Sequence, residues 1–176
     1  MRLIEKPQSG EYPPYAEMYM KWVPTDGLLL QHLWENFLVA KNLLLTLRED
    51  KLLFKYREDK WTIKEVLVHI IDDERIYAYR AMCFARNERT PLPGFEQEEY
   101  AFYSDANNRN IENIFEEYEA VRKSTITLFN GLPDEALARS GTANNSKATV
   151  RALAYHIAGH ELHHMNIIRE KYLSGL

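Results

Sequence analysis

The sequence predicts an all-α protein, a four-helix bundle preceded by an irregular N-terminal arm. Apolar residues recur at intervals of three and four along four segments of roughly 20 residues each, which is the pattern of amphipathic helices. Polar or Pro-containing stretches separate these segments. No segment of the chain shows a convincing alternation of apolar and polar residues, the pattern of a β-strand. At 176 residues, with 45% hydrophobic and 27% charged residues, the chain has the length and composition of one soluble domain with a substantial core.

The first 24 residues are predicted to form the arm, because Pro and Tyr recur there without helical periodicity. We expect its aromatic side chains to pack on the bundle, which takes up residues 25–176 of the same single domain. The first helix should begin after Thr25 or Asp26 and end near Arg48. Its core-facing residues keep an alternation of three and four: Leu30, Leu33, Phe37, Ala40, Leu44 and Leu47.

The second helix has the clearest start signal in the chain. Thr62 and Glu65 are spaced as a capping box, in which each side chain bonds the backbone N–H of the other residue. The helix should reach about Arg86, before the Pro- and Gly-containing segment 90–95 interrupts it. Its apolar face is predicted to consist of Ile63, Val66, Ile70, Tyr77, Ala81 and Phe84.

The remaining two helices complete the bundle. One is predicted from about Arg109 to Asn130, where Gly131 gives the expected stop. After a polar loop, the last helix should begin near Thr149 and run to about Leu173. Bundles of this kind build metal sites from side chains on facing helices. The core candidates on the third helix are Ile111, Phe115, Tyr118, Ile126 and Phe129.

Composition and charge exclude several classes of function. A formal net charge of −4 gives no basic surface for nucleic acid. No apolar run approaches the roughly 20 residues of a membrane span, and the first residues lack the apolar stretch of a signal peptide. The single cysteine, Cys83, cannot form an internal disulfide and is predicted to be a packing residue inside a helix. We therefore expect a cytoplasmic protein that binds neither nucleic acid nor membrane.

Four of the six histidines lie within one short segment of the last helix: His156, His160, His163 and His164. Residues four apart on a helix lie one turn above each other, so His160 and His164 could both bind one metal ion at about 2.0–2.1 Å. Both share a face with apolar residues, which points them inward. Two inward imidazoles must be hydrogen-bonded or bound to a ligand.

A third ligand has to come from another helix. Only His32 and His69 lie outside the cluster, and His69 flanks the apolar face of the second helix. His69, His160 and His164 would make a three-histidine site with open positions for water or substrate, as in catalytic rather than structural metal sites. The competing interpretation is that such histidines are core residues bonded to their neighbours, and we prefer that interpretation for His32.

Other polar residues near these histidines are weaker candidates. Asp73 and Arg80 follow His69 by one and about three helical turns, so they form a polar strip beside the apolar face. Asp73 could orient His69 or a bound water, and Arg80 could attract an anionic substrate, although Asp73 could equally belong to a solvated acidic face. His156 is assigned to the surroundings of the site or to an alternative ligand position. His163 is expected to be flanking or solvent-facing.

The segment 160–164 also matches the H-E-x-x-H pattern of zinc proteases, in which the glutamate is the general base. The extended protease pattern would place Gly at position 167 and His at position 170, where this chain has Ile167 and Glu170. Glu161 lies about 100° around the helix from His160, which does not by itself aim it at a metal bound there. We therefore disfavour a protease.

The chain resembles the DinB-like (DinB/YfiT) family of bacterial four-helix-bundle proteins over nearly its whole length. The matching stretches are residues 15–24, 60–75, 90–95, 141–144 and 151–164. The resemblance implies a metal triad of His69, His160 and His164 with no ligand missing and, by analogy, a homodimer. Some members look like metal-dependent transferases that use a low-molecular-weight thiol, and many have no assigned reaction. The family name implies no DNA binding.

These features predict a metal-dependent enzyme that acts on a small molecule, by thiol (S-) transfer or by hydrolysis. Zn²⁺ and Ni²⁺ are the expected ions, and a low-molecular-weight thiol is the cosubstrate that the resemblance suggests. No catalytic side chain is assigned beyond the pocket candidates Asp73, Arg80 and His156. One alternative is a non-catalytic, metal-stabilised bundle that binds a small molecule or responds to stress. The aromatic residues expected at the metal pocket or at a homodimer surface are Tyr15, Tyr19, Phe95 and Tyr100.

Overall fold

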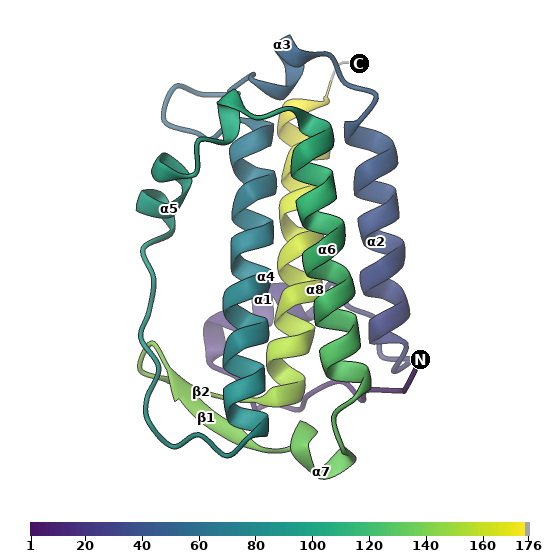
Figure 1. Cartoon of the computed structure of the whole chain (residues 1–176), viewed down its shortest axis with the longest axis vertical. Coiled ribbons are helices and arrows are strands. Elements are labelled where there is room, and N and C mark those ends of the chain that lie inside the picture. Colours follow the sequence, from purple (N-terminus) through teal and green to yellow (C-terminus); the bar gives the residue numbers. More distant parts are fainter. Residues whose placement is uncertain (175–176) are drawn as a thin grey trace.

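Four long helices form the body of the protein in the computed structural model, which describes residues 1–174. α2 and α8 run in one direction and α4 and α6 in the other (Figure 1). α4 packs on α6 and most extensively on α8, while α2 packs on both α6 and α8. The predicted all-α four-helix bundle is therefore confirmed. The four helices are α2 (Leu29–Leu44), α4 (Ile63–Ala85), α6 (Ile111–Asn130) and α8 (Val150–Ile167).

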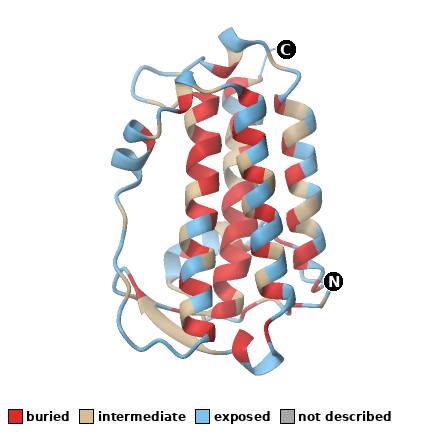
Figure 2. Cartoon of the chain, in the orientation of Figure 1, coloured by how far each residue is buried: buried red, intermediate tan, exposed pale blue. Residues whose placement is uncertain are grey.

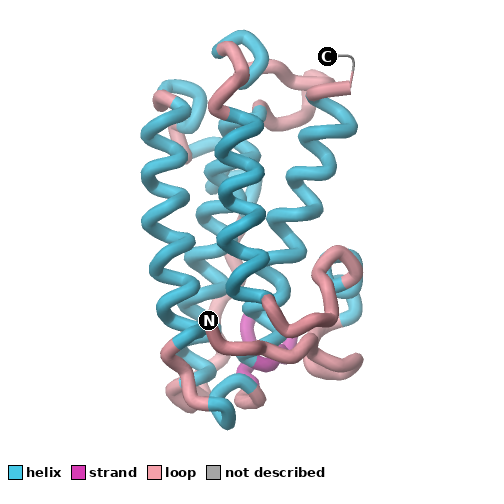
Figure 3. Tube along the Cα trace, turned by 90° about the vertical axis from the view of Figure 1, so that its right-hand side faces the viewer, coloured by secondary structure: helices cyan, strands magenta, loops and turns pink. Residues whose placement is uncertain are grey.

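The connection from α4 to α6 runs along the outside of the bundle, because these consecutive helices point in the same direction (Figures 1 and 3). It carries α5 (Gln97–Tyr103) and a 3₁₀ turn, η2 (Ala106–Asn108). The other two links stay at the ends of the bundle. They contain α3 (Glu49–Leu52), between α2 and α4, and α7 (Asp134–Leu137), between α6 and α8.

Helix boundaries agree with the sequence best where a capping or stop signal is present. The capping box of Thr62 and Glu65 is formed in both directions at the start of α4. α6 ends at Asn130, as predicted, with Gly131 as the next residue. The Thr149 side chain caps α8 by accepting a hydrogen bond from the backbone of Ala152.

Two predicted boundaries were wrong. The first helix begins at Leu29, later than expected, because Gly27 just before it adopts a positive φ of 76°. It ends at Leu44, where a turn follows, and the short helix α3 (Glu49–Leu52) is a separate element and not a continuation. The last helix changes its hydrogen bonding near its end, where Ile168–Tyr172 form a π-helical turn, η3.

A β-hairpin precedes α8, where the sequence predicted only a polar loop. Its strands are β1 (Ser140–Ala143) and β2 (Ser146–Thr149), paired antiparallel. Asn144 and Asn145 both have positive φ values, 47° and 58°, as a two-residue type I′ turn requires. The strands are short and mostly polar, so they lack the apolar alternation on which strand prediction depends.

The N-terminal arm contains a 3₁₀ turn, η1 (Pro14–Ala16), followed by one short helix, α1 (Glu17–Met20). α1 packs directly on α8. The close approach depends on Gly159, because a Cβ added there would lie 2.7 Å from the carbonyl carbon of Tyr19. The arm thereby reaches the histidine-rich part of α8.

Replacing Gly159 with alanine is therefore expected to destabilise the protein, although alanine is the better helix former. The new methyl group would meet backbone atoms of α1, which must shift, and overpacking of this kind costs about 1–3 kcal/mol. Urea unfolding of the G159A variant measures the loss. A stability equal to or above that of the wild type would show that the arm does not lie against α8 as described.

The core consists of two apolar clusters that lie toward opposite ends of the bundle. Figure 2 shows the buried residues on the inward faces of the long helices, with α8 buried through most of its length. Between the two clusters lies a layer of buried polar residues, namely Asp73, Glu74, Arg122, His160 and Glu161. None of the helices within residues 1–174 is long and apolar enough to cross a membrane.

Candidate metal centre

Three histidine side chains from two helices converge in the middle of the bundle. His69 extends from α4, and His160 and His164 extend from successive turns of α8. One ring nitrogen from each lies within 4.8 Å of the other two. His69 and His160 are buried and His164 is half-buried. The structure thus brings together the three residues that the sequence predicted as a metal triad.

The geometry of the triad fits a metal ion better than it fits hydrogen bonds. His160 Nε2 lies 3.1 Å from the Nε2 atoms of both His69 and His164. A single ring nitrogen has one proton or one lone pair in its plane, so it cannot make a full hydrogen bond with both neighbours. Three nitrogens bound to one tetrahedral ion at about 2.0–2.1 Å would lie roughly 3.3 Å apart. The observed separations around His160 are close to that value.

The protonation state of the triad also suits a metal. Burial lowers the pKa of His69. Burial, with further repulsion from neighbouring histidines, lowers the pKa values of His160 and His164 well below the usual range. Burial therefore favours the neutral form of all three imidazoles, which is the form that binds a metal.

Asp73 lies behind the triad, against the ring nitrogen of His160 that faces away from the other two ligands. Its Oδ2 atom is 3.4 Å from His160 Nδ1 and 3.3 Å from His156 Nε2. Asp73 is only 4% exposed, so it does not belong to a solvated acidic face. A carboxylate next to the outer nitrogen of a ligand histidine favours the tautomer that leaves Nε2 free for the metal.

His156 lies outside the triad and packs between Asp73 and an aromatic ring. Its ring stacks on Tyr77 with centroids 3.6 Å apart and an interplanar angle of 2°. Tyr19, from α1, contacts the rings of both His156 and His160 edge-on, at 4.9 and 5.4 Å. His156 therefore forms part of the wall around the triad.

Glu161, the glutamate of the H-E-x-x-H pattern, points away from the triad. It is fully buried and accepts a 2.6 Å hydrogen bond from the Tyr118 hydroxyl, and its other oxygen lies 3.0 Å from Arg122. Both partners are on α6 and neither belongs to the triad. The side chain that a zinc protease would use as general base is thus part of a buried ion cluster. The helical angle predicted only that this side chain is not aimed at the metal.

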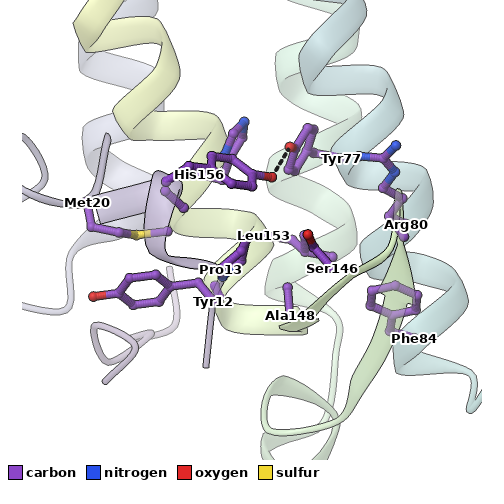
Figure 4. Close-up of a pocket in the computed structure, with 14 residues that line it drawn as sticks. Tyr12, Pro13, Met20, Tyr77, Arg80, Phe84, Ser146, Ala148, Leu153 and His156 are labelled. Atoms are coloured by element: carbon purple, nitrogen blue, oxygen red, sulfur yellow. Dashed lines mark hydrogen bonds between the residues drawn. The ribbon is translucent and has the colours of Figure 1, made fainter. Parts of the chain in front are cut away.

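Two pockets meet at the triad. The first, here called the Asp73 pocket, has a volume of about 340 Å³ and is lined in part by Asp73, Tyr77, Arg80, His156 and His160. The second, here called the His164 pocket, has a volume of about 280 Å³ and is lined in part by Trp61, His163 and His164. Tyr19 and Gln97 line both. The Asp73 pocket adjoins a smaller cavity next to the hairpin, with which it shares Tyr77, Arg80 and His156 (Figure 4).

The aromatic residues expected at the metal pocket are found there in most cases. Tyr15, Tyr19 and Phe95 line the Asp73 pocket. Tyr100 lies behind Phe95, with ring centroids 5.3 Å apart, and is 48% exposed. The arm and the connection from α4 to α6 thus supply walls to a site whose floor is α4 and α8.

Two histidines have surroundings that differ in part from expectation. His163 is half-buried and edge-on to Tyr19, and it lines the His164 pocket instead of facing solvent. His32 is hydrogen-bonded, as expected, with Nε2 2.9 Å from Asp26 Oδ2. It is not a core residue, however, because it lies near the start of α2 with 21% of its side chain exposed.

Sequence reasoning missed two residues of the site. Tyr77 was assigned only to the core, although it stacks on His156 and lines the Asp73 pocket. Gln97 was not considered at all, because α5 lies on a long connection whose position no local sequence signal reveals. For Tyr77, the spacing of four residues from Asp73 was a usable signal, since such residues share a helix face.

Comparisons with known proteins agree with this architecture. Residues 30–168 match the DinB superfamily. A protein of Oceanobacillus iheyensis named "Putative metal-dependent hydrolase OB0413" is 29% identical over 126 residues, which cover 70% of this chain and 72% of that protein. The solved structure described as "YfiT from Bacillus subtilis is a probable metal-dependent hydrolase with an unusual four-helix bundle topology" matches with a TM-score of 0.72. It has 16% sequence identity and covers 94% of this chain and 90% of that one. At this level of identity, the likeness shows the fold.

Proposed function

Because this chain belongs to the DinB superfamily, we propose that it is a metal-dependent enzyme that acts on a small molecule. The observation that carries the proposal is the convergence of the Nε2 atoms of His69, His160 and His164. Three protein ligands leave positions open for a reactant, unlike a structural site that fills all four. The relative from Oceanobacillus iheyensis, whose name is "Putative metal-dependent hydrolase OB0413", supports the same class of activity.

A divalent ion held by the triad would lower the pKa of a bound water or thiol, so that either could act as a nucleophile at neutral pH. The surrounding residues have separate tasks. Asp73, whose Oδ2 atom lies 3.4 Å from His160 Nδ1, would orient that ring and favour the tautomer with its proton on Nδ1. Tyr19, from the arm, lies edge-on to His160, and Tyr77, from α4, stacks on His156. Both rings exclude some water, which strengthens the electrostatic interactions of a bound reactant.

Two pockets at one triad favour a reaction between two small molecules. The His164 pocket and the Asp73 pocket reach different members of the triad, so a thiol in one could attack an electrophile in the other. We therefore place thiol transfer first and hydrolysis, which needs only one organic reactant, second. Zn²⁺ and Ni²⁺ are the proposed ions, because imidazole nitrogen suits both.

The test is a paired assay on protein reconstituted with Zn²⁺ or Ni²⁺. One arm supplies a low-molecular-weight thiol with 1-chloro-2,4-dinitrobenzene, and the other supplies 4-nitrophenyl acetate in water. Faster metal-dependent turnover in the first arm supports thiol transfer, and turnover in the second arm alone supports hydrolysis. The His160→Ala variant is the control for both. No metal-dependent turnover in either arm, across a panel of thiols, would favour the non-catalytic alternative.

Chelation of the metal should lower the melting temperature without unfolding the helices. A ligand bound only by the native state at about 100 times its dissociation constant adds roughly 2.7 kcal/mol, which corresponds to about 5–10 °C for a domain of this size. The helices should persist because the two apolar clusters form without the triad. Circular dichroism melts with and without EDTA measure the shift. Complete loss of helicity at 25 °C on chelation would instead indicate a structural metal.

A further inference from the structure

Arg80, near the end of α4, is a buried cation without an acidic partner. It is only 5% exposed, yet within residues 1–174 no carboxylate oxygen lies within ion-pairing distance of its guanidinium group. The other fully sequestered arginine, Arg122, has two glutamates around it. A buried charge is costly unless another group neutralises it. The surroundings of Arg80 therefore leave room for an anion.

The Arg80 side chain is held in place from three directions. Its Nη2 atom donates a 2.9 Å hydrogen bond to the carbonyl of Pro93. Its guanidinium carbon lies 5.0 Å from the centre of the Tyr77 ring and 6.0 Å from that of Phe95. This leaves most of its five N–H donors unused by the protein. A fixed guanidinium with free donors is suited to bind a carboxylate through two parallel hydrogen bonds.

The loop that supplies Pro93 is itself anchored to the hairpin. Leu92 exchanges backbone hydrogen bonds with Thr142 and Asn144, at 2.9 and 3.0 Å. Gly94 lets the loop approach closely, because a Cβ there would lie 2.6 Å from the side-chain oxygen of Asn144. The loop that accepts the hydrogen bond from Arg80 is thus itself bonded to the hairpin, which helps to hold the guanidinium group at the pocket.

Arg80 lies on the same pocket as the triad. Both Arg80 and His160 line the Asp73 pocket, whose volume of about 340 Å³ is that of a small-molecule site. The α-carbons of His69 and Arg80 are about 16 Å apart along α4, and helical side chains lean toward the N-terminal end, so the guanidinium is directed back toward the triad. Tyr15, Tyr19 and Phe95 add apolar walls.

Two acidic residues share this pocket, Asp73 and Glu96. Asp73 lies against His156 and His160 and would be offset by a cation in the triad. Glu96 is exposed, so water screens its charge. With a divalent ion in the triad, positive charge therefore exceeds negative charge in the pocket. The positive charge that no carboxylate neutralises is then that of Arg80.

We propose that Arg80 binds the carboxylate of a small substrate whose apolar or aromatic body lies along Tyr77 and Phe95, with its reactive end at the triad. This inference rests on the proposed function and specifies its substrate class. It assigns the Asp73 pocket to the carboxylate-bearing reactant and leaves the His164 pocket to the second reactant.

The test compares phenylacetate with its neutral analogue phenylacetamide, using isothermal titration calorimetry on the metal-loaded full-length protein. Wild-type protein, Arg80→Gln and Arg80→Lys are measured. The matched control is Arg86→Gln, which removes an exposed arginine near the end of the same helix. Metal content and melting temperature are measured on every variant, so that a folding or metal defect is recognised separately.

The wild-type protein should bind the carboxylate about ten to a hundred times more tightly than the amide, as a charged hydrogen-bonded pair predicts. R80Q should bring that ratio close to one without loss of metal, R80K should give an intermediate ratio, and R86Q should leave it unchanged.

The inference is overturned if R80Q keeps the wild-type ratio, which would place the carboxylate on the metal alone. It is also overturned if wild-type protein binds both probes equally or fails to bind the carboxylate at millimolar concentration. A protein that shows the Arg80-dependent ratio but holds no metal would contradict the proposed function and not this site.

Discussion

Replacing His160 with alanine is expected to reduce the bound metal from close to one ion per chain to nearly none. His160 is the central member of the triad, because its Nε2 atom lies 3.1 Å from both other ligand nitrogens. It is also the ligand that Asp73 orients. Loss of an outer partner of a ligand already weakens metal binding about 10–100-fold, so loss of the ligand itself should weaken it further. Elemental analysis of the purified variant measures the effect.

The neighbouring histidine provides the control. His163 is on the same helix and three residues away, but it contacts Tyr19 and lies outside the triad. His163→Gln should therefore retain the metal, as should His32→Ala, whose histidine is bonded to Asp26 at the start of α2. Full metal retention in both His160→Ala and His69→Ala would refute the assignment of the triad.

The sequence predicted the helices best where a local signal marks their ends. The capping box at Thr62 and the Asn130–Gly131 stop both specify a boundary through side-chain or backbone bonds within a few residues. The parallel arrangement of α4 and α6 was not predicted, because it depends on the path of the connection between them and not on any short motif. The hairpin could have been suspected from the Asn144–Asn145 pair, since asparagine tolerates the positive φ of a type I′ turn.

The triad was predictable for a different reason. Two histidines four residues apart fix each other's relative position on a helix. His69 was proposed as the third because it flanks the apolar face of another helix, and the family resemblance implied the same three residues. The partners of Asp73 and Glu161 were beyond the reach of the sequence, because they depend on how α4, α6 and α8 are rotated against one another. The same holds for His156 and Arg80. The sequence marked both as candidates near the site, but only the fold shows that Tyr77 packs against both.

Replacing Arg122 with methionine is expected to destabilise the protein by about 3–5 kcal/mol, because it leaves two buried carboxylates without a cation. Arg122 is fully buried, and its guanidinium group lies 2.9 Å from Glu74 and 3.0 Å from Glu161. It also donates to the carbonyl of Leu33 on α2. One side chain thus connects all four long helices through the polar layer that separates the two apolar clusters.

The adjacent Lys123 gives a matched control. Its side chain is 61% exposed and pairs with Glu119 one turn away on the surface of α6. Lys123→Met should therefore change the free energy of unfolding by no more than about 1 kcal/mol. Urea unfolding in the presence of EDTA compares the variants without a contribution from the metal. Equal stabilities of the two variants would mean that the buried cluster contributes no more than a surface pair.

The free energy of unfolding of the Arg122→Met variant should depend on pH in a predictable direction. Burial raises the pKa of Glu161, and removing Arg122 removes the charge that opposes this effect. An acid whose folded-state pKa is raised destabilises the folded protein above its unfolded pKa, and this penalty decreases as the pH falls and the group becomes protonated. The stability deficit of R122M relative to wild type should therefore decrease as the pH is lowered from 7 to 5.

Adding Glu74→Leu to R122M should recover part of the lost stability at pH 7, because one of the two carboxylates left without a cation is then replaced by an apolar group. If both results hold, the glutamate of the H-E-x-x-H pattern acts in the core of the bundle, where it binds α8 to α6 while His160 and His164 face His69.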